Sequence, residues 1–303
     1  MTITNVPGVK VGHKQNELAR TGCTVILTED GATCGVDVRG SAPGTRETDL
    51  LDPVNLVEQV HAISLAGGSA YGLDAASGVM QFLEEKGVGM DVGVAKVPIV
   101  PSAILFDLAV GDANVRPDQQ MGYEAAKVAS HSPVKQGAFG AGCGATVGKV
   151  AGFEAASKGG LGSASVELDN GLVVGAIVAV NAVGDVCDSV TGEILAGARN
   201  LETGEFLNSA QMMRKQAEVD GIAGTNTTIG AVAVNAKLTK AEAKKIAQMT
   251  QNALGRTISP AHTMYDGDTI FALATGKEHA SVDLIGQLAT EVMEEAIQNA
   301  VGK

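Results

Sequence analysis

The segment TNTTIGAVAVNAKL, residues 225–238, decides the fold, because it places hydroxyl residues at the start of a long apolar run. Valine, isoleucine and alanine dominate residues 229–238, which predicts a buried strand. The polar loop DGIAGTNTT, residues 220–228, precedes this strand. A helix pattern begins near Thr239 directly after it, so we expect a strand and a helix in succession.

Thr227 stands where an N-terminal nucleophile requires its hydroxyl. A threonine hydroxyl is a poor nucleophile, but cleavage before Thr227 would create an α-amino group with an ordinary pKa of ~7.7 to 8.0, which can act as the adjacent base. The same hydroxyl could make the cut by attacking the Asn226 carbonyl, provided that the loop twists the peptide. The alternative is an ordinary strand start with a turn asparagine before it.

The rest of the chain mixes strand and helix patterns, so we expect one α/β unit over residues 1–303. Two β-branched runs around Glu29-Asp30-Gly31 predict a hairpin within residues 21–40. The Gly- and Val-rich residues 137–190 predict closely paired strands with a turn at Asp169-Asn170-Gly171. Further predictions are a strand over residues 269–276 and helices over residues 67–86, 209–219 and 281–301.

Composition excludes several classes of function. The 303 residues are 45% hydrophobic, which is enough apolar surface for a compact globular protein. A formal net charge of -12 opposes binding to nucleic acid or to an anionic membrane surface. Aromatic residues make up only 3% and tryptophan is absent, so there is little material for stacking on bases or sugars.

Cysteine usage and the apolar stretches predict a cytoplasmic protein outside the membrane. The four cysteines, Cys23, Cys34, Cys143 and Cys187, are scattered without CxxC spacing. The N-terminal residues MTITNVPG have no basic region leading into an apolar one. The longest apolar stretch, Leu172 to Val180, is far shorter than the ~20 residues of a membrane helix.

Familiar cofactor and metal motifs fail on the residues that they need. In GATVGK, residues 144–149, the following Val150 replaces the hydroxyl that would hold Mg²⁺. The glycines of residues 140–144 lack the last glycine of a dinucleotide fingerprint. The five histidines form no zinc-binding pair, and the DGD of residues 266–268 does not continue as a calcium loop. We therefore expect neither a metal nor an organic cofactor.

Four ordered blocks together resemble a known family. They are RGSAPGTRETDLLDP (39–53), GGSAYGLDAASGVM (67–80), NTTIGAVAVNAKLTKAEAKKIA (226–247) and PAHTMYDGDTIFALATG (260–276). These blocks are similar to those of the DmpA-type peptidases, also described as L-aminopeptidase/D-esterase-like proteins. Relatives in that superfamily include β-peptidyl aminopeptidases and nylon-oligomer (6-aminohexanoate-oligomer) hydrolases. The resemblance spans nearly the whole chain.

The resemblance implies a fold and a self-processing event. The implied fold is the DmpA/ornithine-acetyltransferase-like α/β sandwich of sheets flanked by helices, of the N-terminal nucleophile hydrolase type. The implied cut lies between Asn226 and Thr227 and gives an α fragment of residues 1–226 and a β fragment of residues 227–303. Both fragments are expected to stay in one fold, and the resemblance implies a homotetramer or larger homo-oligomer.

The resemblance also implies the catalytic residues. Thr227 matches the nucleophile, and Asp266 and Asp268 match the acidic block beside it. Lys149 matches a lysine next to the nucleophile in the nylon-oligomer hydrolases, and Asn181 matches the donor to the oxyanion. From the residues alone, Asp266 and Asp268 would equally suit a solvated turn, Lys149 a solvent-facing strand end, and Asn181 a buried structural amide.

Two further positions bear on the substrate. Tyr71 lies in a block that lines the substrate pocket in the resemblance. Gln136 stands where some β-peptidyl members carry a glutamate, so a preference for β-amino acids does not carry over. The expected substrate is a small amide or a short peptide.

The expected function is an aminopeptidase-like hydrolase of amide bonds in short substrates, with ester bonds as a second type of target. The runner-up is an endo-type 6-aminohexanoate-oligomer hydrolase, which fits the set Lys149, Asn181, Asp266 and Asp268. An acyltransferase of the ornithine acetyltransferase type would use similar threonine chemistry. An uncleaved, inactive binding or assembly protein is the alternative of another class.

Overall fold

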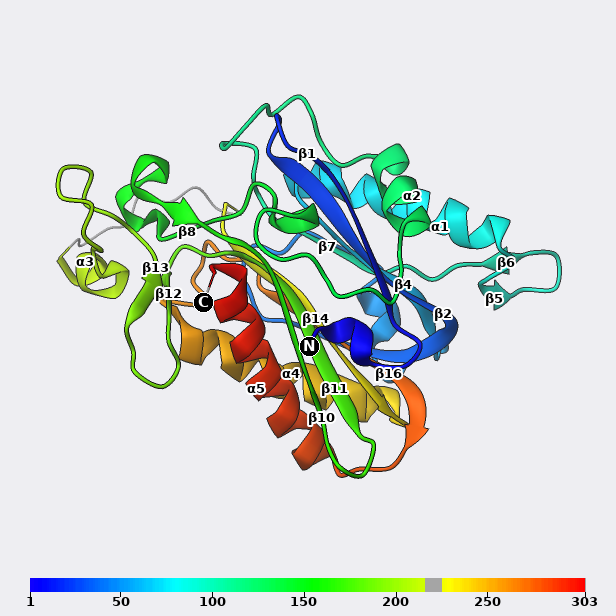
Figure 1. The fold of residues 1–303 in the computed structure, drawn as a ribbon. Coiled ribbons are helices and arrows are strands. Elements are labelled where there is room, and N and C mark those ends of the chain that lie inside the picture. The colour runs from blue at the N-terminus through cyan, green and yellow to red at the C-terminus, as the bar shows by residue number, and fades with distance from the viewer. Residues whose placement is uncertain (216–224, 303) are drawn as a thin grey trace.

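One long strand, β2 (Thr21–Val38), links the two halves of the molecule. In the computed structural model, which describes residues 1–215 and 225–302, the main sheet has the order β10-β11-β14-β16-β2-β4-β7-β3, with β1 paired to β2. The first half of β2 pairs with β1 and β4, and its second half pairs with β16. The sheet therefore divides at β2 into two layers, and helices cover the outer face of each layer (Figure 1).

The strands of the first layer are β10 (Gly160–Glu167), β11 (Val173–Asn181), β14 (Thr227–Ala236) and β16 (Thr269–Glu278). Those of the second are β1 (Lys10–Asn16), β3 (Thr45–Arg46), β4 (Val60–Ala66) and β7 (Ser102–Ile104). Short strands pair outside these layers: β5 (Met90–Asp91) with β6 (Lys96–Val97), β8 (Thr146–Val147) with β9 (Ser157–Lys158), and β12 (Asp185–Cys187) with β13 (Ile194–Ala196) and β15 (Ile258–Ser259). The α-helices are α1 (Ala75–Glu85), α2 (Gln119–Lys127), α3 (Ser209–Lys215), α4 (Lys240–Thr257) and α5 (Val282–Ala300).

Successive side chains on the strands point to opposite faces of the sheet, and they pack into three apolar cores. On β14, Val232 and Val234 pack with α4 and α5, whereas Ile229 and Ala231 pack between the two sheet layers. On β4, Ile63 belongs to that same middle core, while the neighbouring residues on the strand pack under α1 and α2. This period of two is the signature of strands that are buried on both faces. The predicted sandwich of sheets flanked by helices is confirmed.

Local signals start and seat the helices of the first layer. Thr239 and Glu242 form a capping box at the start of α4, and Ser281 accepts from the Leu284 N–H at the start of α5. Glycine lets α5 approach the sheet closely, because a Cβ at Gly162 would lie 1.9 Å from the Ala296 carbonyl oxygen. A side chain at this position would push the helix off the sheet.

The strand directions bring three chain segments to one edge of the sheet. β14 and β16 run parallel with Ile229 opposite Thr269, so the residues just before both strands lie together. β11 runs antiparallel to β14, which sets its last residue, Asn181, opposite Thr227. This edge is where the candidate site is built.

The segment that was expected to form a hairpin at residues 21–40 is the single strand β2. The two β-branched runs do not pair with each other; the pairing register of β2 with β4 shifts between Leu27 and Ala32 instead, and Gly31 has a φ of +85°. An Asp-Gly pair favours a tight turn, but in this chain it lies at a local irregularity within one strand. The other predicted turn is confirmed: Gly171, with a φ of +83°, lies between β10 and β11.

The strand predicted over residues 269–276 and the helix over residues 281–301 agree with β16 and α5. The helix predicted over residues 67–86 is a 3-10 helix, Ser69–Asp74, followed by α1. Residues 137–190 contain the predicted paired strands and also three short 3-10 helices.

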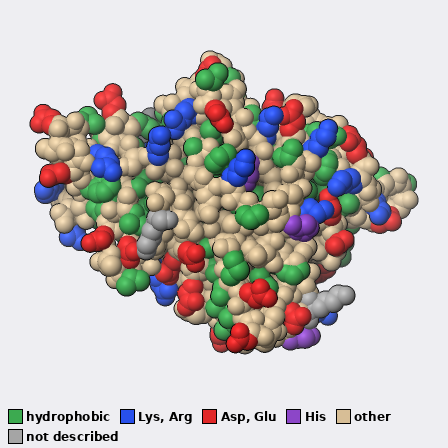
Figure 2. All heavy atoms as spheres, viewed as in Figure 1, with side chains coloured by type: hydrophobic (Ala, Val, Ile, Leu, Met, Phe, Trp, Pro, Cys, Tyr) green, Lys and Arg blue, Asp and Glu red, His purple; other side chains and the backbone are tan. Residues whose placement is uncertain are grey.

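The helix expected over residues 209–219 begins at Ser209 and is described as far as Lys215. Residues 216–224, which include the start of the predicted polar loop of residues 220–228, lie outside the described residues. Within the described part of the chain, no helix is long and apolar enough to cross a membrane. Figure 2 shows acidic and basic side chains interspersed over the face in view.

Candidate active site

Thr227 and Asn181 form the centre of the site. They are directly opposite each other on β14 and β11, and Asn181 has the same strand parity as the residues of the middle core, so both side chains lie between the sheet layers. Asn181 is fully buried and Thr227 is 2% exposed. A polar pair at this depth needs hydrogen-bond partners, and the surrounding loops supply them.

The peptide bond before Thr227 is held from two sides. The Thr227 hydroxyl Oγ1 donates to the carbonyl oxygen of Asn226, and the Gly267 N–H donates to the same oxygen at 2.9 Å. Gly267 lies close to the hydroxyl as well, because a Cβ there would be 3.0 Å from Thr227 Oγ1. The predicted nucleophile thus lies beside the predicted scissile carbonyl, and an N–H group polarises that carbonyl.

Lys149 is buried rather than exposed at a strand end. It follows Gly148, whose φ of +75° turns the chain inward at the start of a short 3-10 helix. Its ammonium Nζ donates to Asn181 Oδ1 at 2.8 Å, to the Asn181 carbonyl at 3.0 Å and to the Thr146 carbonyl at 3.1 Å. Burial lowers the pKa of Lys149 to about 7, although the charge of Asp266 opposes that shift.

The Asn181 amide is fixed in one orientation. Its Oδ1 accepts from the Thr146 N–H at 3.0 Å as well as from Lys149, and its Nδ2 donates to the Phe106 carbonyl at 3.0 Å. The same Nδ2 donates to the Thr225 carbonyl at 3.3 Å, and Lys149 Nζ donates to that carbonyl at 3.4 Å. Two donors therefore converge on one carbonyl oxygen just before the Asn226–Thr227 bond.

The two aspartates lie on the other side of Thr227. Asp268 Oδ1 accepts from the Thr228 N–H at 2.7 Å, and Asp266 Oδ2 accepts from the N–H and the hydroxyl of Thr263 at 2.6 and 2.7 Å. Burial, together with the charge of Asp268, raises the pKa of Asp266 to about 6. Among the described residues, neither carboxylate is hydrogen-bonded to the Thr227 hydroxyl, so their effect on it is through charge and through the backbone beside it.

Sequence reasoning missed His262, which it considered only as one of five histidines that form no zinc-binding pair. Its Nδ1 is hydrogen-bonded to Asp268 Oδ2 at 2.8 Å, and its backbone has a φ of +56°. Burial acts to lower the pKa of His262, but the hydrogen bond and the charge of Asp268 outweigh burial and raise it. The only signal in the sequence was that His262 lies four residues before Asp266 and six before Asp268. A turn brings His262 back to Asp268.

Tyr71 lies outside this buried group. Its side chain is 60% exposed, and the Arg116 guanidinium lies 3.7 Å from the centre of its ring. Its loop is tied toward the site by Asp107, whose Oδ1 accepts from the Gly68 N–H at 2.7 Å and whose predecessor Phe106 accepts from Asn181. Burial raises the pKa of Asp107. The structure thus connects Tyr71 to the site by one loop and not by direct contact.

Gln136 is committed to the sheet, since its Oε1 accepts from the Ser163 N–H of β10 at 2.9 Å. Because glutamine is neutral, Gln136 provides no negative charge that could pair with the ammonium group of a substrate. Within residues 1–215 and 225–302, no three histidine, cysteine, aspartate or glutamate side chains are grouped as metal ligands.

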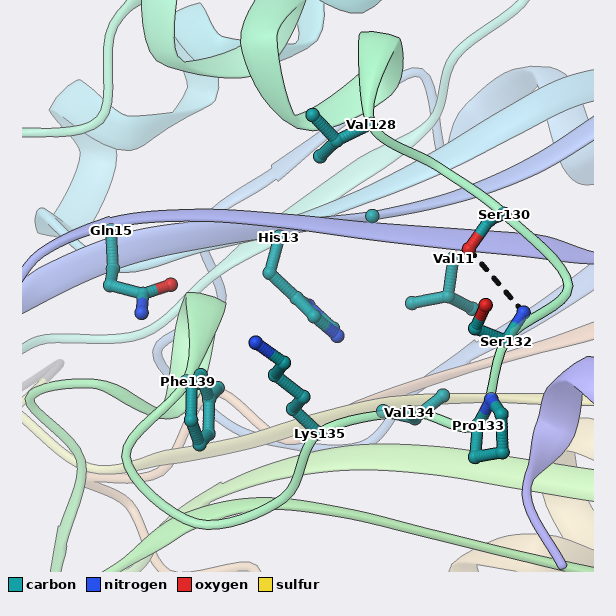
Figure 3. A pocket seen from close by; sticks show the side chains of 11 residues that line it. Val11, His13, Gln15, Val128, Ser130, Ser132, Pro133, Val134, Lys135 and Phe139 are labelled. Carbon is teal, nitrogen blue, oxygen red and sulfur yellow. Dashed lines mark hydrogen bonds between the residues drawn. The ribbon is translucent and has the colours of Figure 1, made fainter.

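A separate cavity of about 310 Å³ opens beside β1 (Figure 3). His13 and Lys135 point toward each other across it, and Phe139 lies at its side. Burial, helped by the charge of Lys135, lowers the pKa of His13 to about 4, so His13 is neutral near pH 7. This cavity shares no lining residue with the site around Thr227.

Solved structures define the class of the fold. The L-aminopeptidase D-Ala-esterase/amidase of Ochrobactrum anthropi, described as a variant of the Ntn hydrolase fold, matches with a TM-score of 0.74 at 19% identity over 99% of this chain and 85% of that chain. A Burkholderia sp. β-aminopeptidase matches with a TM-score of 0.69 at 22% identity over the same shares. The chain therefore has the fold of N-terminal nucleophile hydrolases.

Sequence comparison identifies the family. Residues 1–303 match the model of Peptidase family S58, and the chain belongs to that family. An uncharacterized aminopeptidase of Mycobacterium leprae is 46% identical over 300 residues, covering 92% of this chain and 80% of that protein. A 6-aminohexanoate-oligomer endohydrolase of Kocuria sp. is 32% identical over 311 residues, covering 97% and 84%. The chain is a hydrolase acting on amide bonds.

The buried ammonium of Lys149 predicts a pH dependence of stability. Above pH 7 the folded chain has lost this proton, whereas the unfolded chain keeps it until about pH 10.4, so the free energy of unfolding rises with pH in this window. In a Thr227→Ala background, Lys149→Met should remove a rise of roughly 2 kcal/mol between pH 7 and pH 9. Urea unfolding at both pH values measures this rise.

The exposed Lys158 provides the control, because Lys158→Met removes a lysine without opening the site. A slope with pH that is the same in the Lys149→Met variant and its Thr227→Ala parent would contradict the assignment of the titration to Lys149.

Proposed function

We propose that this chain is a self-processing N-terminal-threonine hydrolase that cleaves amide bonds of short substrates in the manner of an aminopeptidase. The observation that carries the proposal is the arrangement around residues 225–227: a hydroxyl and an N–H group on one carbonyl, and two further donors on the carbonyl before it. The proposed unit is a single domain of residues 1–303, cut into fragments 1–226 and 227–303.

Self-processing begins with attack of Thr227 Oγ1 on the Asn226 carbonyl carbon. The charge that develops on the Asn226 oxygen is stabilised by the Gly267 N–H. The bond from the Asn226 carbonyl carbon to the Thr227 nitrogen breaks, the nitrogen takes up the proton that Oγ1 gives up, and an ester joins Asn226 to Thr227 Oγ1. Water opens this ester, which leaves a carboxylate on Asn226 and a free α-amino group on Thr227.

Substrate hydrolysis then uses the freed amine as the base. It takes the hydroxyl proton as Thr227 Oγ1 attacks the substrate carbonyl and returns that proton to the leaving amine, and water releases the acyl group from the ester. The Asn181 Nδ2 and Lys149 Nζ groups, which hold the Thr225 carbonyl before the cut, stabilise the substrate oxyanion. Asp266 and Asp268 favour the protonated amine through their negative charge.

A second candidate is the hydrolysis of 6-aminohexanoate oligomers. It is supported by the clustering of Lys149, Asn181, Asp266 and Asp268 around Thr227, which is the residue set expected for that activity, and by the 32% identical endohydrolase. The two candidates share one mechanism and differ in the chain between the amine and the attacked carbonyl.

We also propose a cytoplasmic homotetramer or larger homo-oligomer. Free cysteines support the reducing compartment, since Cys23, Cys34 and Cys143 are buried without a disulfide. Exposed apolar side chains such as Leu18 and Val94, 96% and 97% exposed, support contact between subunits.

Intact-mass measurement with N-terminal sequencing tests self-processing. The purified protein should contain a fragment that begins Thr-Thr-Ile-Gly, and Thr227→Ala should remain one full-length chain with amidase activity below ~10⁻³ of the wild type. Thr227→Ser keeps a hydroxyl and should still be cut. A full-length wild-type chain that hydrolyses amides would refute the mechanism, and a full-length inactive chain would favour a binding protein.

Gly267→Ala should slow self-processing by roughly 10-fold, which is about 1.4 kcal/mol in the barrier. Its Cβ would lie 3.0 Å from Thr227 Oγ1 and 2.8 Å from the Ala42 carbonyl oxygen, so Gly267, whose N–H holds the scissile carbonyl, must shift relative to the nucleophile. The time course of the full-length band after synthesis measures the rate. Gly255→Ala is the matched control, because a Cβ there meets open space; equal rates in the two variants would argue against a role for this contact.

Turnover of defined substrates separates the candidate functions. An aminopeptidase should release p-nitroaniline from alanyl-p-nitroanilide, whereas an oligomer hydrolase should cut 6-aminohexanoate trimer internally. Asn181→Ala should lower kcat by ~10²-fold or more on the preferred substrate, because one oxyanion donor is lost. Acyl transfer to added ornithine in place of hydrolysis would instead indicate an acyltransferase.

A further inference from the structure

Two phenylalanine side chains meet beside the oxyanion donors. The rings of Phe106 and Phe153 lie 6.5 Å apart between centres with an angle of 43° between their planes. Phe153 is 38% exposed and Phe106 is half-buried, so the pair reaches the surface. The whole chain contains six phenylalanines, and the meeting of two of them at this place brings apolar surface directly against a polar site.

Each phenylalanine is linked to one of the two donors, Phe106 through its backbone carbonyl and Phe153 through its ring. The Phe106 carbonyl accepts from Asn181 Nδ2 at 3.0 Å, and Lys149 Nζ lies 5.9 Å from the centre of the Phe153 ring. Phe106 follows β7, whereas Phe153 begins the short 3-10 helix Phe153–Ala155 just after Lys149. Two separate loops thus place an aromatic side chain beside the same pair of donors.

The donors fix the place that a substrate carbonyl oxygen takes in the proposed mechanism. Asn181 Nδ2 and Lys149 Nζ converge on the Thr225 carbonyl oxygen, and after the cut this place is taken by the oxygen of the attacked carbonyl. Groups attached to that carbonyl then lie next to the residues that flank the two donors. Phe106 and Phe153 flank one donor each.

We propose that Phe106 and Phe153 form the wall of a subsite for an apolar chain on the acyl side of the substrate. This inference rests on the proposed function and names its substrate class: amides whose attacked carbonyl carries an aliphatic side chain or an unbranched run of methylenes. The edges and faces of two rings bury such a chain, while they offer no hydrogen bond or countercharge to a polar one.

The size of the preference follows from burial. Each methylene that leaves water favours binding by roughly 3- to 4-fold, so a norleucyl group, with three more methylenes than an alanyl group, gains up to about 60-fold if the wall covers it fully. Partial exposure of Phe153 makes a preference of about 10-fold the expected result.

The test compares kcat/KM for norleucyl-p-nitroanilide and alanyl-p-nitroanilide in cleaved protein, with cleavage verified by intact mass. Wild type should prefer the norleucyl substrate by about 10-fold, Phe153→Leu should keep most of that preference, and Phe153→Ala should lose it. Phe153→Gln is a second loss variant of similar length, which an exposed position tolerates. Phe139→Ala is the matched control, because Phe139 lines the separate cavity of Figure 3.

The inference is overturned if wild type shows no preference for the longer chain, or if Phe153→Ala and Phe153→Gln keep the wild-type preference while they still hydrolyse the alanyl substrate. It is also overturned if Phe139→Ala loses the preference to the same extent. Failure of the proposed function looks different, because wild type itself would then remain uncut or inactive on both substrates.

Discussion

The parallel pairing of β14 with β16 is the constraint on which the site depends. Parallel neighbours have their amino ends at the same edge, so the residues before Thr227 and before Thr269 must meet, and a crossover helix must connect the strands. α4 is that crossover, and its capping box starts it three residues after β14 ends. The pairing continues one step beyond the regular strands as a bridge between Asn226 and Asp266. Residues that are forty positions apart in the chain thereby enclose one peptide bond.

Burial gives this edge its chemistry. Lys149 and Asp266 carry opposite charges in a region from which water is largely excluded, and their pKa values move toward each other, to about 7 and about 6. Both groups therefore exchange protons near neutral pH, where an α-amino base also operates. The ammonium tolerates this depth because carbonyl and amide oxygens surround it, and the carboxylate does so because Thr263 donates twice to one of its oxygens. The site is an electrostatic network and depends on each of these donors and acceptors.

Local patterns predicted the elements well where packing and turn chemistry agree, and failed where the same residues serve two geometries. The β14 strand, the capped α4 helix and the turn at Gly171 follow from periodicity and from residues with special backbone freedom. Gly31 shows the limit, because an Asp-Gly pair suits a hairpin and an irregular strand alike, and only the partner strands decide. Of the site, the sequence offered Thr227 as a nucleophile, while the grouping of Lys149 and Asn181 with the aspartates came from family resemblance. His262 and the Thr225 carbonyl could not be predicted, since one depends on a turn and the other is backbone.

Two sets of donors bind two successive carbonyl groups, those of Thr225 and Asn226. In the intact chain the Gly267 N–H donates to the Asn226 carbonyl, while Asn181 and Lys149 donate to the carbonyl of Thr225, one residue upstream. In the proposed mechanism, a substrate oxyanion would therefore have to displace the Thr225 carbonyl from Asn181 and Lys149. The proposed cut would release it, because residues up to 226 would then end in a free carboxylate whose charge is repelled by Asp266 and Asp268. In the proposed mechanism, the event that creates the base would therefore also free the oxyanion donors, and the intact chain would have neither the base nor the free donors.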